Sequence, residues 1–89
     1  MPKINFKQFK LFTDITQEHT DTVDVSRAFA DTLYQQGSGI VTHDLALRIY
    51  RSKGEMELTA EEVSLIQRFA QRVCRPAFID SIDANLVED

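Results

Sequence analysis

The chain has 89 residues, of which 43% are hydrophobic and 27% charged, and its formal net charge is -4 at pH 7. These values are ordinary for a small globular domain, so they argue against a disordered, fibrous or membrane-spanning chain. The negative charge disfavours nonspecific binding to nucleic-acid phosphates. We expect one folded domain over residues 1–89, with frayed ends at 1–3 and 87–89.

The first segment, residues 3–25, has two competing interpretations. Ile4 and Phe6 alternate with polar residues, and residues 22–25 alternate in the same way, which is typical of half-buried strands. The polar residues 16–21 between them then form the loop of a β-hairpin. A helix is the alternative, because three phenylalanines recur at steps of three: Phe6, Phe9 and Phe12. We favour the hairpin.

The next segment predicts a helix over residues 26–36, where apolar residues recur at helical spacing. Ser26 or Asp24 is expected to be the N-cap, because its side-chain oxygen can accept a hydrogen bond from an unpaired amide of the first turn. Gly37 is expected to close the helix in the left-handed conformation.

A second helix is predicted over residues 43–52. Thr42 is its expected N-cap, and Asp44 lies in the first turn, where the helix dipole favours a negative charge. Residues 40–41 are expected to form either a scrap of strand or a buried plug. If they are a strand that pairs with residues 56–58, the segment resembles a helix-loop-helix pair of the EF-hand type, but its two loops lack the oxygen ligands of a calcium site, which excludes calcium binding.

Two further helices are predicted, over residues 60–74 and 76–86. Thr59 and Glu62 form a capping box at the start of the first, and Pro76 suits the first position of the second. The expected fold is therefore α+β and mostly helical, with an N-terminal β-hairpin followed by four helices around one small core.

The inventory of reactive side chains is poor. Cys74 is the single cysteine, and it falls on the apolar stripe of its helix, as expected of a small buried hydrophobe. His19 and His43 are too few for a metal site, and no glycine loop has the lysine or spacing of a phosphate cradle. We therefore expect no enzymatic activity, no metal and no cofactor.

The aromatic residues outnumber what so thin a core can bury, and exposed apolar patches mark interaction sites. Some of them are expected on a partner-binding surface, unless the hairpin folds over the helices and hides them. The candidates are Phe9, Leu11, Phe12, Tyr34 and Tyr50.

Arginines at steps of four and three lie on one face of the predicted helix 60–74 and form a candidate strip for anions or nucleic acid. A solvated face paired with nearby acids is the competing interpretation, because surface helices commonly show this pattern. The strip, with two arginines of the preceding helix, comprises Arg48, Arg51, Arg68, Arg72 and Arg75.

The function expected from these patterns is a non-enzymatic protein-interaction or regulatory module, such as an adaptor, inhibitor or assembly factor. Its partner is expected to be another protein or a second copy of itself. The alternative is a nucleic-acid-binding regulator that uses helix 43–52 and the strip Arg68, Arg72 and Arg75. No secretion signal or membrane-spanning run is present, so we expect a cytoplasmic location.

Overall fold

The computed structural model describes residues 2–87. It contains four helices and four short strands, which confirms the predicted α+β, mostly helical class. In chain order the elements are β1 (Lys3–Asn5), β2 (Phe9–Phe12), β3 (Thr20–Val23), α1 (Ser26–Gln36), α2 (Ile40–Arg51), β4 (Glu55–Glu57), α3 (Ala60–Val73) and α4 (Pro76–Asn85).

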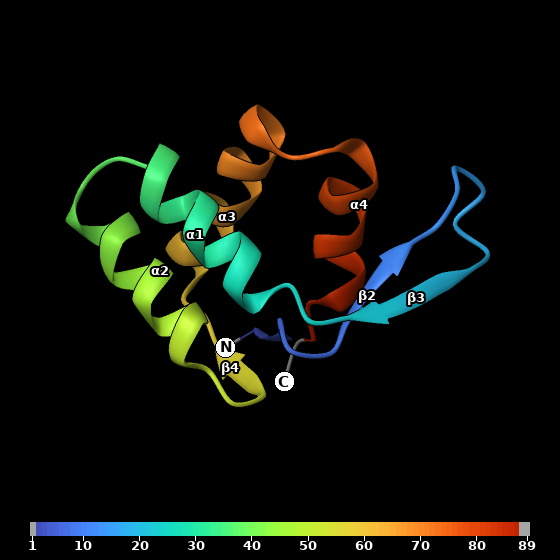
Figure 1. Cartoon of the computed structure of the whole chain (residues 1–89), viewed down its shortest axis with the longest axis horizontal. Helices are drawn as coiled ribbons and strands as arrows, with labels where there is room; N and C mark the ends of the chain where they lie inside the picture. The colour runs from blue at the N-terminus through green and yellow to red at the C-terminus, as the bar shows by residue number, and fades with distance from the viewer. Residues whose placement is uncertain (1, 88–89) are drawn as a thin grey trace.

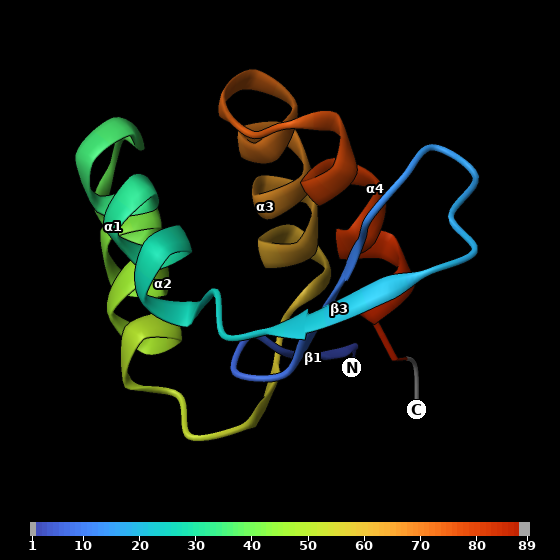
Figure 2. The ribbon, with the colours of Figure 1, turned by 45° about the vertical axis from the view of Figure 1, so that its right-hand side comes forward.

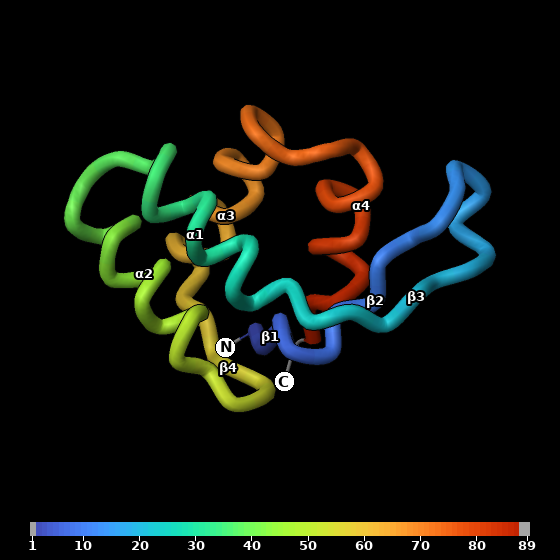
Figure 3. The backbone as a smooth tube through the Cα atoms, in the orientation of Figure 1, coloured from blue at the N-terminus to red at the C-terminus, as the bar shows by residue number. Residues whose placement is uncertain are grey.

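The helices form a row with the strands beside and beneath it. Helices α1 and α2 pack together as a helical hairpin at one end, and α3 lies between this pair and α4 (Figures 1 and 2). The hairpin of β2 and β3 packs against α4 and projects from the opposite end (Figure 3). The longest axis of the molecule, 37 Å, therefore runs from the α1–α2 pair to the tip of the β-hairpin.

The predicted N-terminal hairpin is confirmed, although its strands and loop are shifted. Strand β2 pairs antiparallel with β3, with Phe9 opposite Val23 and Phe12 opposite Thr20. The loop between them covers residues 13–19 rather than 16–21.

The segment before this hairpin belongs to a separate sheet. Strand β1 pairs antiparallel with β4, and Ile4 lies opposite Met56. The predicted pairing of residues 40–41 with 56–58 is therefore wrong. Ile4 is almost fully buried, so the pairing is fixed by an apolar side chain that must face the core.

The other edge of β2 is covered by side chains of α4. The Asn85 side chain accepts a hydrogen bond from the Lys10 amide at 2.9 Å and donates one to the Lys10 carbonyl at 2.9 Å. The Ser81 hydroxyl accepts a hydrogen bond from the Phe12 amide at 3.0 Å and donates to the Ala77 carbonyl. Helix α4 thus satisfies backbone groups that a neighbouring strand would otherwise pair.

The core is built around a cluster of phenylalanine rings from the strands and three helices. Phe29 lies at its centre, with ring centroids 5.4 Å from Phe6, 5.2 Å from Phe78 and 6.1 Å from Phe69. Phe9 completes the cluster, 5.0 Å from Phe78. Five of the six phenylalanines of the chain therefore stabilise one core rather than a surface.

Helix α1 begins at Ser26 as predicted, but its N-cap is Val25. The Asp24 carboxylate accepts hydrogen bonds from the Ser26 amide at 3.0 Å and the Ser26 hydroxyl at 2.7 Å. These two bonds hold the pKa of Asp24 below its ordinary value of 3.8, and the nearby Lys7 ammonium adds to the effect. Asp24 therefore fixes the start of α1 from one residue upstream of the cap.

Stability should consequently depend on the ionisation of Asp24. A carboxyl group whose pKa is lowered by folding stabilises the folded state above its ordinary pKa, and this contribution disappears as the pH falls through the folded-state pKa. Asp24→Asn should therefore lower the urea midpoint at neutral pH, and the gap to the wild type should close well below pH 3.8. Asp31→Asn, on the exposed face of α1, is the control that should show no such gap. A gap independent of pH would contradict the assignment.

The turn between α1 and α2 differs most from expectation. Helix α2 begins at Ile40, not at 43, because Gly39 is its N-cap with φ of 88°. Thr42 is therefore an interior, buried residue, and Asp44 lies beyond the first turn. Gly37 has φ of -77° rather than the predicted left-handed conformation.

The glycine at position 37 is instead required by close packing. A Cβ atom there would lie 2.3 Å from the Thr42 methyl carbon and 2.5 Å from the Leu33 carbonyl oxygen. The chain therefore reverses between the helices because Gly37 lets Thr42 pack directly on the backbone.

The predicted capping box of α3 is confirmed. The Thr59 hydroxyl accepts from the Glu62 amide at 3.1 Å, and the Glu62 carboxylate accepts from the Thr59 amide at 2.9 Å. The second Glu62 oxygen forms an ion pair with Arg48. One side chain thus caps α3 and links it to α2.

The last two helices end one residue before their predicted limits, at Val73 and Asn85. Lys3 and Val87 were expected to fray, yet they exchange two backbone hydrogen bonds of 2.8 and 2.9 Å. The fraying predicted for residues 1 and 88–89 lies outside the described residues. Within residues 2–87, no helix has the length and apolar character needed to cross a lipid bilayer.

Candidate protein-interaction surface

Two of the predicted partner-binding residues, Tyr34 and Tyr50, lie on one groove between α1 and α2. The groove has a volume of about 200 Å³, with the small side chains of Ala30 and Ala46 at its base. Tyr34 is 62% exposed and Tyr50 is 53% exposed. We call this site the tyrosine groove, and it is lined by Arg27, Ala30, Asp31, Tyr34, Ala46, Leu47 and Tyr50.

At the Tyr34 end of the tyrosine groove, the tyrosine ring contacts a ring of the neighbouring helix. The Tyr34 ring packs against the His43 ring of α2, with centroids 5.5 Å apart. His43 is thus a helix residue that supports an aromatic neighbour. Because a tyrosine carries a large apolar area with few rotatable bonds, a held tyrosine is well suited to bind another protein.

The other three candidates of this surface lie elsewhere. Phe9 is fully buried in the phenylalanine cluster, so its predicted place on the surface is wrong. Leu11 and Phe12 lie in β2 and are half-buried, near α4 rather than α1. The β-hairpin therefore packs on the far side of the molecule from the two tyrosines.

The α1–α2 turn adds two exposed apolar side chains to this end of the molecule. Ile40 is 83% exposed and Val41 is 59% exposed, although both lie at the start of α2. The sequence analysis did not select them, because it expected a scrap of strand or a buried plug at residues 40–41. The sequence signal for a helix start there is the preceding Gly39, because glycine is a favourable helix N-cap residue.

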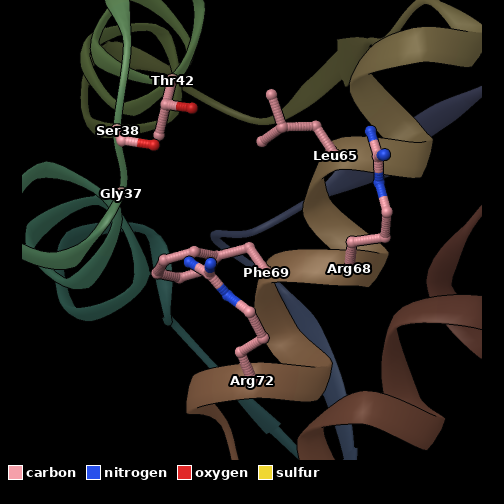
Figure 4. Close-up of a pocket in the computed structure, with 7 residues that line it drawn as sticks. All are labelled: Gly37, Ser38, Thr42, Leu65, Arg68, Phe69 and Arg72. Atoms are coloured by element: carbon pink, nitrogen blue, oxygen red, sulfur yellow. The ribbon is translucent and has the colours of Figure 1, made fainter.

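Arg68 and Arg72 of the predicted strip meet at a second site, a pocket of about 330 Å³ between α3 and the α1–α2 turn. The side chains of Leu65 and Phe69 extend from α3 toward Thr42 and form its apolar part (Figure 4). We call this the arginine pocket, and it is lined by Gly37, Ser38, Thr42, Leu65, Arg68, Phe69 and Arg72.

Each guanidinium group of the arginine pocket contacts other groups of the protein, but neither forms an ion pair with a carboxylate of residues 2–87. Arg72 lies over the Phe69 ring, 5.9 Å from its centroid, which is a cation–π contact. Arg68 donates to the Ser64 carbonyl at 3.3 Å. Within residues 2–87, neither arginine forms an ion pair, so both charges are available to an anionic group.

The remaining arginines of the strip do not join this pocket. Arg48 is held by Glu62 and donates to the Glu57 carbonyl at 3.2 Å. Arg75 lines a different hollow, and Arg51 is exposed at the end of α2. The five arginines therefore do not form one continuous strip, and two of them, Arg68 and Arg72, line the same pocket.

Cys74 lies in the hollow that contains Arg75, which has a volume of about 240 Å³ and includes Phe29 and Phe78. The thiol is half-buried, and this burial raises its pKa. It stays protonated at neutral pH, and a protonated thiol is a poor nucleophile. The described residues contain no group of three or more metal-ligating side chains.

Comparison of this chain with protein-family models, with curated proteins and with solved structures finds no match. The two sites described above are therefore interpreted from their own residues and geometry.

Proposed function

We propose that this protein is a non-enzymatic protein-interaction module that binds its partner protein through the α1–α2 hairpin. One observation supports the proposal above all. Six large apolar residues of the described chain are exposed, and four of them lie within this hairpin: Tyr34, Ile40, Val41 and Tyr50.

Two of these side chains share one site, because Tyr34 and Tyr50 line the tyrosine groove, and exposed apolar residues that lie together mark interaction sites. Ile40 and Val41 lie at the other end of α2 from Tyr50, and Val41 lines a separate hollow with α3. The tyrosine groove also has charges at its rim, from Arg27 and Asp31, which matches the apolar centre and polar border of protein interfaces.

The test compares the wild type with a tyrosine-groove variant, Tyr34→Ser/Tyr50→Ser, as baits for proteins of the source cell. A protein enriched by the wild type should be lost by this variant, and the purified pair should then bind at least about thirtyfold more weakly, as expected when about 2 kcal/mol of interface energy is removed. Both positions are exposed, so stability should change by less than about 0.5 kcal/mol.

Val87→Ser is the matched control, because Val87 is 51% exposed but lies far along the chain from the groove. It should retain the partner. If the groove variant and the control retain the same proteins with the same affinity, this surface is not the binding site.

Nucleic-acid binding through α2 and the arginines is the competing proposal, supported by the unpaired Arg68 and Arg72. It has less support, because Arg48 is already paired and the exposed start of α2 carries the apolar side chains of Ile40 and Val41 instead of basic side chains. Phosphate contacts would produce a mobility shift that weakens steeply with salt. The absence of a shift at low salt would exclude it.

A further inference from the structure

The loop of the β-hairpin presents one apolar side chain to solvent. Ile15 is 97% exposed, the largest exposure among the large apolar residues of the described chain. It belongs to the loop 13–19 that joins β2 to β3. This end of the β2–β3 hairpin lies at the end of the molecule opposite the α1–α2 pair (Figures 1 and 3). An isoleucine in this position contributes nothing to the core.

The loop that carries Ile15 is held in one conformation. The Asp14 carboxylate accepts from the Thr16 amide at 3.2 Å and the Thr16 hydroxyl at 2.6 Å. Gln17 has φ of 60°, uncommon for a residue with a side chain, and its side-chain amide donates to the Asp80 carboxylate of α4 at 3.2 Å. These hydrogen bonds join the residues on either side of Ile15 and link the loop to α4.

The surroundings of Ile15 are acidic. Asp14 and Glu18 flank it in the loop, and Asp21 follows at the start of β3. Asp80 of α4 lies beside the loop and lines the same hollow. The hairpin loop thus carries an exposed apolar side chain with acidic residues at neighbouring positions.

The arginine pocket has the complementary arrangement. Its base is apolar, from Leu65 and Phe69, and its charges are the guanidinium groups of Arg68 and Arg72, which form no ion pair with any other residue of 2–87. An isoleucine can contact the base while neighbouring carboxylates meet the arginines. Guanidinium groups bind carboxylates with directed, charge-assisted hydrogen bonds, so the two surfaces are complementary in charge and in apolar character.

We propose that the hairpin loop of one copy of this chain docks in the arginine pocket of a second copy. The loop and the pocket lie toward opposite ends of the 37 Å axis, so one copy cannot satisfy both by itself. The contact joins two different surfaces, so it either closes into a ring, of which a reciprocal dimer with two loop-to-pocket contacts is the smallest, or continues into an open filament. The inference goes beyond the proposed function and uses a different surface from the tyrosine groove.

The test is sedimentation velocity of the purified protein from micromolar to millimolar concentration, at low and high salt. At low salt the average mass should rise with concentration above the monomer mass, to a closed ring of two or more copies or to longer filaments, and high salt should return it to the monomer because the contact is charge-assisted. A wild type that stays monomeric at every concentration at low salt overturns the proposal.

Charge reversal identifies the two surfaces. Arg68→Glu/Arg72→Glu reverses the pocket, and Glu18→Lys/Asp21→Lys reverses the loop without changing Asp14, which holds the turn. Each variant alone should remain monomeric, and a mixture of the two should assemble again, because each then carries the partner charge of the other. All four positions are exposed, and circular dichroism should confirm that both variants fold.

The controls separate this inference from the proposed function. Arg75→Glu changes an exposed arginine outside the pocket and should assemble like the wild type. Assembly that survives Arg68→Glu/Arg72→Glu overturns the loop-to-pocket contact. Assembly that stops at a dimer and is lost in Tyr34→Ser/Tyr50→Ser also overturns it, and assigns self-association to the tyrosine groove.

Discussion

Replacement of Phe29 by alanine is expected to lower the free energy of unfolding by about 3–5 kcal/mol. The ring is 3% exposed and contacts three other phenylalanines, from β1–β2 and from two helices, so its removal leaves a cavity at the centre of the core. A small domain has a total stability of about 5–15 kcal/mol, so this loss removes a large fraction of the total.

Urea denaturation followed by circular dichroism measures this effect. Tyr34→Ala is the control, because it also removes an aromatic ring from α1 but at a position 62% exposed. It should change the free energy of unfolding by about 0.5 kcal/mol or less. A loss for Phe29→Ala no larger than that of the control would show that the phenylalanine cluster does not determine stability.

A second large effect is expected at Gly37, where alanine should cost about 1–3 kcal/mol. Its methyl group would have to displace the Thr42 side chain and the Leu33 carbonyl oxygen, and the latter is backbone within α1. Gly39→Ala should cost a similar amount for a different reason, because its φ of 88° with ψ of 163° is a conformation almost confined to glycine.

Gly54 provides the matched control for both glycines. A Cβ atom there meets nothing within 4 Å, and its φ is not positive, so alanine should be neutral or stabilise by less than about 1 kcal/mol. Thermal unfolding of the three single variants, at Gly37, Gly39 and Gly54, gives the order of their stabilities directly. Equal melting temperatures for the Gly37 and Gly54 variants would contradict the packing assigned to the α1–α2 turn.

The parts of the fold predicted well are those whose signals are local. The capping box of Thr59 and Glu62 needs a separation of only three residues, and it located the start of α3 correctly. The bounds of α1 followed from helical spacing in the same way. Local patterns thus determined most helix limits to within one residue.

The errors arose where a distant segment decides the structure. Strand β1 pairs with β4 more than fifty residues away, and no local pattern of Lys3–Asn5 identifies that partner. Ile40 and Val41 resemble a strand in isolation, because both are β-branched, yet Gly39 and the packing of Thr42 on Gly37 start a helix there.

The candidate sites divide in the same way, between residues whose placement follows from local patterns and residues whose placement depends on distant segments. Tyr34 and Tyr50 are exposed, which agrees with their positions on the outer faces of helices. Phe9 lies in a strand, and which face of that strand is buried depends on α4. Spacing placed Arg68 and Arg72 together correctly but could not show that Arg48 is held by Glu62 across two helices. Ile15 was overlooked because a single apolar residue in a loop carries no periodicity.

The covering of β2 by Ser81 and Asn85 restricts how a partner can be recognised. An incoming peptide that extends a sheet needs free amides and carbonyls along an edge strand. On β2 the amide and carbonyl of Lys10 and the amide of Phe12 are already bonded to α4 side chains, and the exposed edge of the hairpin belongs to β3, where Asp21 places a charge. Strand addition to this hairpin is therefore blocked on one side and discouraged on the other. The proposed partner would then contact side chains, rather than the backbone, of the β2–β3 hairpin.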